Sequence, residues 1–124
     1  MQQSKPSFLT SIKIAHRGLY NNKDIPENSV AAFKNCEKYG FTTETDVHFS
    51  KDKKLIVFHD DNLKRMTGLD KNLSDCTLAE IKQLHLGNTN EKIPTLEEML
   101  NLNLTLLIYI LVILFFLHHP HKYL

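Results

Sequence analysis

The chain has 124 residues, which is enough for one domain. Its composition, with 42% hydrophobic and 23% charged residues, excludes a disordered or collagen-like polypeptide. Its 15 Lys and Arg residues nearly balance 14 Asp and Glu residues, so the net charge of +1 gives no basic excess that would indicate a nucleic-acid partner. The charges are unevenly placed, because every acidic residue lies between Asp24 and Glu98 and no charged residue follows until Lys122.

Residues 1–11 are predicted to form an N-terminal arm. They contain no long apolar run and carry Lys5 and Pro6, so they do not have the pattern of a secretory signal, and we expect a cytoplasmic protein. Cys36 and Cys76 are far apart and lack the spacing of a zinc site. This favours two reduced thiols over a disulfide or a metal centre.

The first predicted elements are a short strand and a helix. Residues 11–15 alternate polar and apolar side chains and lead into a loop at His16–Gly18, which is typical of a strand that ends there. Asn28 and Ser29 are both candidates for the N-cap of the following helix, and Gly40 stands where that helix should end.

Two strands and two short helices are predicted after this helix. Polar turn residues between two apolar runs indicate that the strands form a hairpin, and two Thr-x-x-Glu capping boxes begin the helices. The ranges are 41–49 and 55–58 for the strands, and 78–84 and 96–102 for the helices. A further run of Ile, Leu and Val has the composition of a buried parallel strand. The alternation predicts an α/β fold.

Reactive residue types lie at the predicted ends of three strands. His16 and Arg17 follow the first strand, Glu44 and Asp46 lie in the second, and His59 follows the third. Carboxylates two residues apart on a strand leave the same face and can share a hard divalent cation such as Mg²⁺ or Ca²⁺. Two histidines can then act as acid and base on a phosphate that Arg17 also binds. Each segment alone is more often a turn, a solvated strand face or a polar loop, but their joint occurrence favours a site.

Five consecutive segments of the sequence resemble the glycerophosphodiester phosphodiesterases. They are IAHRG (14–18), PENS with AF (26–33), ETDV (44–47), KD with LIVFHDDNLKRMTG (51–68) and KIPTLEEML (92–100). Their order and spacing agree over residues 12–100, which we assign to the N-terminal part of such a domain. The resemblance implies a TIM-barrel fold, a divalent metal, commonly Mg²⁺ or Ca²⁺, and hydrolysis of glycerophosphodiesters to glycerol 3-phosphate and an alcohol.

The resemblance also assigns roles by position. His16 and His59 match the general acid and base, with their order left open. Arg17 matches the phosphate-binding arginine, and Glu44 and Asp46 match two metal ligands. The attacking group is either water or the hydroxyl of the substrate's own glycerol.

Two other polar residues of these segments have open assignments. Asn28 matches a position at the rim of the family's site, and a plain helix cap is an equal alternative. His48 shares the predicted strand face of Glu44 and Asp46, but a place behind the metal ligands or on the surface is favoured over one beside the metal.

The sequence departs from the family pattern after Leu100. Tyr109 stands where a further metal-ligand glutamate is expected, and a phenol of pKa about 10 cannot replace a carboxylate on a hard cation near neutral pH. A TIM barrel also needs on the order of 200 residues. We therefore expect a partial TIM barrel truncated after about its first half, with an apolar divergent tail at 101–124, and weak or no activity. A genuine but divergent short protein is the alternative.

Two other functional classes stay open. Residues 100–117 are uncharged and reach the lower limit of a membrane-spanning length, so a membrane-attached binding module is one alternative to the soluble enzyme. The β-branched and aromatic residues of this segment and its lack of flanking positive charges weigh against that alternative. A non-catalytic fragment that assembles through an unpaired strand edge is the other.

Overall fold

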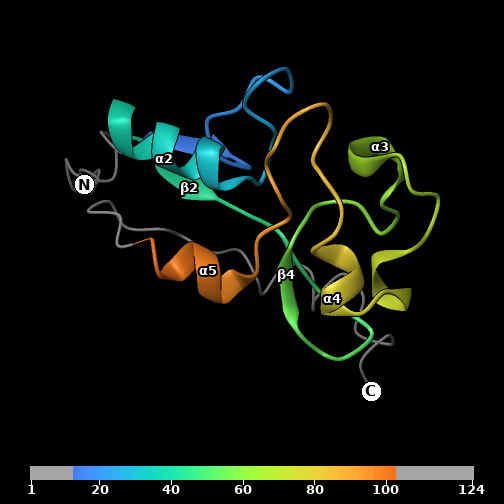
Figure 1. The fold of residues 1–124 in the computed structure, drawn as a ribbon. Helices are drawn as coiled ribbons and strands as arrows, with labels where there is room; N and C mark the ends of the chain where they lie inside the picture. Colours follow the sequence, from blue (N-terminus) through green and yellow to red (C-terminus); the bar gives the residue numbers. More distant parts are fainter. Residues whose placement is uncertain (1–12, 103–124) are drawn as a thin grey trace, which may run out of the picture.

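The computed structural model describes residues 13–102, which form two small sheets with helices packed around them (Figure 1). Strand β1 (Ile14–His16) pairs in parallel with β2 (Thr42–Glu44), and this pairing sets His16 opposite Glu44. Strand β3 (Val47–Phe49) pairs antiparallel with β4 (Leu55–Val57). The predicted α/β class and the predicted hairpin are both confirmed.

Helix α2 (Val30–Tyr39) connects the two parallel strands, and its ends are the predicted ones. The Ser29 hydroxyl accepts a hydrogen bond from the Ala32 N–H at 3.1 Å, which satisfies one of the unpaired donors of the first turn. Gly40 ends the helix in the left-handed conformation at φ 73°. The face formed by Ala32, Phe33 and Cys36 is buried.

The predicted single strand over residues 41–49 is wrong. The strand is interrupted at Thr45 and Asp46. As a result, β2 pairs with β1, and β3 pairs with β4 in a different sheet. Thr45 lies between the strands and donates its hydroxyl hydrogen to the side-chain oxygen of Asn28 at 2.6 Å, and the Asp46 carbonyl accepts from the Phe58 N–H at 3.0 Å. The change of partner explains the break, because no single straight strand can follow both neighbours.

The remaining helices are short. They are α3 (Lys64–Thr67), the 3₁₀ helix η1 (Leu73–Asp75), α4 (Leu78–Ile81) and α5 (Leu96–Leu100). The capping box of α4 is complete, with both reciprocal bonds between Thr77 and Glu80. At α5 only the Thr95 hydroxyl acts as a cap, because the Glu98 carboxylate binds Lys82 at 2.8 Å instead. Both helices end before the predicted positions, and α3 was not predicted.

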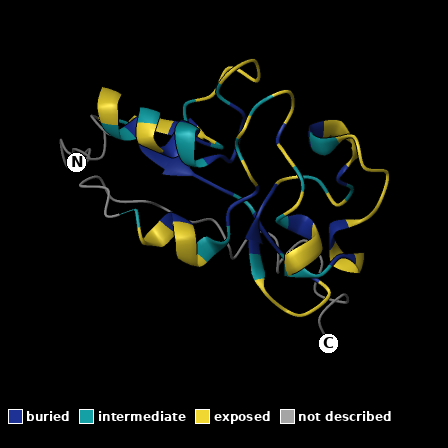
Figure 2. Cartoon of the chain, viewed as in Figure 1, coloured by how far each residue is buried: buried dark blue, intermediate teal, exposed yellow. Residues whose placement is uncertain are grey.

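Two clusters of buried apolar side chains form the core, and Figure 2 shows β2 and most of β4 as buried. The larger cluster joins β4 to α3, η1 and α4. The smaller cluster consists of Phe33 from α2, Val47 from β3, Val57 from β4 and Met99 from α5, each at most 1% exposed. This smaller cluster therefore connects the helix of the first sheet to the strands of the second.

Several sequence-based expectations fall outside the described residues. The N-terminal arm, the predicted strand after residue 102 and the Tyr109 position belong to them, as does nearly all of the 100–117 segment. Within residues 13–102, no helix has the length and apolar character needed to cross a membrane. Both cysteines are buried free thiols, as predicted.

Gly18 follows β1 at a position where a side chain has no room. Its φ is 81°, and an added Cβ would lie 2.7 Å from the Cβ of Ala32 in α2. We expect Gly18→Ala to lower the free energy of unfolding by about 2 kcal/mol, from the left-handed backbone and the overpacking together.

Gly68 provides the matched control for this substitution. It has a similar φ of 85°, but an added Cβ would meet nothing within 4 Å. Gly68→Ala should therefore cost only the backbone component, about 1 kcal/mol. Urea unfolding of both variants measures the difference, and equal losses would show that the contact with α2 is not tight.

Candidate active site

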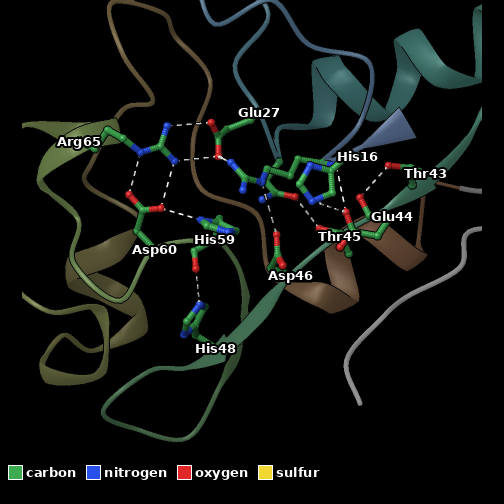
Figure 3. A network of polar contacts seen from close by, with 12 residues as sticks. His16, Glu27, Thr43, Glu44, Thr45, Asp46, His48, His59, Asp60 and Arg65 are labelled. Carbon is green, nitrogen blue, oxygen red and sulfur yellow. Dashed lines mark hydrogen bonds and ion pairs between the residues drawn. The ribbon is translucent and has the colours of Figure 1, made fainter. Parts of the chain in front are cut away.

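The candidate site forms where β1 and β2 end side by side (Figure 3). His16 is the last residue of β1 and Glu44 the last of β2. Their parallel register brings the His16 Nε2 to 3.4 Å from the Glu44 Oε2. The His16 ring is 65% exposed and the Glu44 side chain only 10%, so the imidazole faces solvent over a buried carboxylate.

Arg17 lies at the centre of the acidic groups. Its backbone N–H donates to Glu44 Oε2 at 3.2 Å, its Nη1 donates to Glu27 Oε2 at 3.1 Å, and its Nε lies 3.9 Å from Asp46 Oδ2. Arg17 and Asn28 both have positive φ, 60° and 53°, and the Asn28 N–H donates to the Arg17 carbonyl at 2.9 Å. Asparagine enters this region readily, so Arg17 is the strained residue of the two, and strain of this kind clusters at functional sites.

The two predicted metal ligands form a pair of carboxylates that affect each other's charge. Burial raises the pKa of Glu44, and the negative charge of Asp46 raises it further. Asp46 Oδ2 is buried and has no hydrogen-bond partner, since the Arg17 Nε at 3.9 Å is too distant for one. Oxygen ligands of this kind are those that Mg²⁺ and Ca²⁺ prefer, so Glu44 and Asp46 fit part of a divalent cation's shell.

The rest of such a shell is not found within residues 13–102. No group of three or more His, Cys, Asp or Glu side chains in that range is arranged to hold a metal ion. Tyr109, at the position where a further carboxylate is expected from the sequence, lies outside the described residues.

His59 follows β4 in the second sheet and is tied to its neighbour in sequence. Its Nδ1 lies 2.7 Å from Asp60 Oδ1, and its ring is 39% exposed. Among the described residues, no hydrogen bond or ion pair joins His59 directly to His16, Arg17, Glu44 or Asp46. The structure thus brings four of the five predicted site residues, all except His59, into direct contact. His59 is held instead by its contact with Asp60.

His48 is buried, and its Nε2 lies 2.8 Å from the backbone carbonyl oxygen of His59. Burial lowers the pKa of His48, which favours the neutral ring. The alternative of a surface position for His48 is therefore wrong, and a place behind the metal ligands stays a prediction. His48 supports the loop that carries His59.

Three charged residues without a predicted role complete the arrangement. Glu27, Asp60 and Arg65 form a continuous network that runs from Arg17 to His59 (Figure 3). Burial raises the pKa of Glu27, but hydrogen bonds from Arg65 and Asn22 and the charges of both arginines outweigh it and bring the pKa to about 2. One sequence feature could have identified Glu27 and Arg65, because both lie inside the segments that resemble the family.

Comparison with known proteins decides the family. The model of the glycerophosphoryl diester phosphodiesterase family matches residues 16–113. The chain belongs to this family.

Individual members of the glycerophosphoryl diester phosphodiesterase family agree with this. The chain is 40% identical over 101 residues to a glycerophosphodiester phosphodiesterase of Caldanaerobacter subterraneus, and the match covers 76% of this chain and 41% of the relative. It is 41% identical to the human lysophospholipase D GDPD1 over 81 residues, 64% of this chain and 25% of that protein. A solved phosphodiesterase of Oleispira antarctica, in complex with the product sn-glycerol-3-phosphate, superimposes with a TM-score of 0.67 at 37% identity, covering 73% of this chain and 38% of that one.

The chain spans less than half the length of these family members. The matched parts carry the same α/β arrangement, and they include the described residues of the site. The activity of the longer relatives is therefore a proposal for this chain.

Proposed function

We propose that the site hydrolyses glycerophosphodiesters to glycerol 3-phosphate and an alcohol, as part of a TIM-barrel domain of which this chain supplies the N-terminal part. The observation that carries the proposal is the contact of His16, Arg17 and Glu44 at adjoining strand ends, on segments matched by the family model. The product bound in the Oleispira antarctica structure and the name of the bacterial relative support this substrate class.

The chemistry of the described residues suits this reaction. Arg17 presents a guanidinium that binds a phosphate oxygen with charge-assisted hydrogen bonds. One histidine accepts the proton of the attacking hydroxyl as the new P–O bond forms, and the other donates a proton to the alkoxide that leaves as the old P–O bond breaks. His16 and His59 are assigned to these two tasks, with neither order preferred.

Glu44 and Asp46 would hold a divalent cation, Mg²⁺ or Ca²⁺, at this site. Such a cation supplies Lewis-acid polarisation of a phosphoryl oxygen when it is bound. Support comes from the buried Oδ2 of Asp46, which has no hydrogen-bond partner, and from the raised pKa of Glu44. The Glu44 carboxylate contacts the ring of His16 at 3.4 Å. Because residues 13–102 offer two carboxylates rather than a full shell, we expect weak metal binding and weak activity.

The test is an assay of the purified chain with glycerophosphocholine and either Mg²⁺ or Ca²⁺, with release of glycerol 3-phosphate as the readout. We expect slow release that a chelator stops and that His16→Ala lacks. His85→Ala is the matched control, because His85 is exposed and outside the site, and this variant should keep the wild-type rate. Release by the wild type no greater than that of His16→Ala would refute hydrolysis by this chain.

A parallel assay tests whether the substrate carries an acyl chain on its glycerol, because choline is the leaving alcohol of glycerophosphocholine and lysophosphatidylcholine alike. The name of the human relative indicates a lysophospholipid, and lysophosphatidylcholine is the probe for that class. Release of choline from lysophosphatidylcholine without release from glycerophosphocholine would replace the proposed substrate class by a lysophospholipid.

A further inference from the structure

We infer that Arg65 is a positioning residue of this site, which holds the His59–Asp60 pair in a fixed place relative to Arg17 by binding Glu27 and Asp60 at the same time. The inference rests on the proposed function, because it assigns Arg65 a role in the same site. It goes beyond that function in naming what joins the two halves of the site.

The contacts of Arg65 use two edges of one guanidinium. Nη1 and Nη2 donate to the two carboxylate oxygens of Glu27, both at 2.9 Å. Nε and Nη2 donate to the two carboxylate oxygens of Asp60, at 2.7 and 3.1 Å. Because the guanidinium is planar and rigid, two bidentate pairs on its edges fix the position of one carboxylate relative to the other.

Glu27 is the fixed end of this arrangement. Its side chain is 3% exposed, and Asn22 donates to its Oε1 at 3.0 Å. Its Oε2 accepts from Arg17 Nη1 as well as from Arg65 Nη2, so that the two arginines share a single carboxylate oxygen. A displacement of Arg65 therefore affects Arg17 directly, because both side chains bind the same Glu27 Oε2.

Asp60 is the end that acts on His59. Its Oδ1 contacts both the His59 Nδ1 at 2.7 Å and the Arg65 Nη2. The hydrogen bond from Arg65 lowers the pKa of Asp60 to about 2, so the carboxylate is ionised at neutral pH and can only accept. The shared hydrogen must then belong to the His59 Nδ1, which leaves Nε2 of the neutral ring free to accept a proton.

The network also bridges the two sheets. Glu27 lies in the loop after β1, whereas Asp60 and Arg65 follow β4, and Arg65 and Glu27 are 38 residues apart in sequence. Asp60 and its histidine are partly exposed, so without Arg65 the pair would be held mainly by its own loop. If Arg65 only stabilised the fold, replacing it would not change the tautomer of His59. The tautomer of His59 therefore distinguishes a positioning role from a purely structural one.

The experiment records ring-nitrogen NMR spectra of the full chain with ¹⁵N-labelled histidines, at a pH of about 8, where free imidazole is neutral. In the wild type we expect His59 to be the Nδ1–H tautomer. In Arg65→Gln and in Arg65→Lys its two nitrogen signals should move toward those of a rapidly exchanging tautomer mixture, while the His85 signals stay in place. The Lys variant keeps the positive charge between the carboxylates, so it decides the result where the Gln variant does not fold.

Lys64→Gln is the matched control, since it removes a neighbouring positive charge that lies 3.9 Å from the exposed Asp70. It should leave the His59 signals unchanged. Unchanged His59 signals in folded Arg65→Lys would overturn the inference, as would signals in the wild type that already show a mixture. The readout needs no turnover, so an inactive chain with the expected spectra would refute the proposed function and leave the positioning role intact.

Discussion

Replacing Phe33 by alanine should lower the free energy of unfolding by about 3–5 kcal/mol, the usual cost of removing a buried aromatic ring. Phe33 is completely buried and belongs to the cluster of α2, β3, β4 and α5. An added Cβ on Gly18 would lie 3.2 Å from the Phe33 ring, so this ring also lies under the loop that carries Arg17. The variant should therefore loosen the site as well as the core.

Urea unfolding followed by far-UV circular dichroism measures this loss. Tyr39→Ala is the control, because it removes an aromatic ring from the same helix where the residue is 57% exposed, and it should change the stability by less than about 0.5 kcal/mol. Similar losses for the two variants would mean that the small cluster does not join the sheets as described.

Glu27→Gln should lower the stability at pH 7 by about 3 kcal/mol. The carboxylate accepts from Arg17 and from both terminal nitrogens of Arg65, and an amide would turn one of its oxygens into a donor that faces a guanidinium. The charge itself gives the pH dependence. Since the pKa of Glu27 is about 2 in the folded chain and 4.5 ordinarily, its stabilisation is present above about pH 4.5 and is lost as the pH falls through 2.

Urea unfolding of the wild type and Glu27→Gln across this pH range tests the prediction. The gap between the two proteins should be widest above pH 4.5 and should shrink toward pH 2. Glu97→Gln serves as the control, because Glu97 is exposed on α5 and its loss should have no comparable effect. A gap that stays constant with pH would show that the ionised form of Glu27 is not what stabilises the fold.

The features that could be predicted from the sequence are those set by neighbouring residues. Ser29 and Gly40 mark the ends of α2, and the turn after β3 needs only polar residues and one backbone at positive φ, Lys53 at 63°. The loop after β1 was also predicted, from the His-Arg-Gly segment, although His16 itself belongs to the strand. These signals act over a few residues and do not depend on the rest of the fold.

The features that could not be predicted depend on partners far away in the chain. The break at Thr45 follows from the change of pairing partner from β1 to β4, and the network follows from Arg65 reaching Glu27 over 38 residues. No sequence periodicity links an acidic and a basic residue at such separations, so their pairing cannot be predicted from the sequence. The sequence could name candidate site residues, but not the residues that contact them from distant parts of the chain.

The division of the strands into two sheets has a consequence for the two histidines. His16 ends a strand of the parallel pair, and His59 follows a strand of the antiparallel pair, and within the described residues these pairs share no strand-to-strand ladder. Each histidine can thus keep its own local structure while the two are apart. The two histidines come together only when side-chain packing docks one sheet against the other, so the geometry of this candidate site depends on tertiary order more than on intact secondary structure.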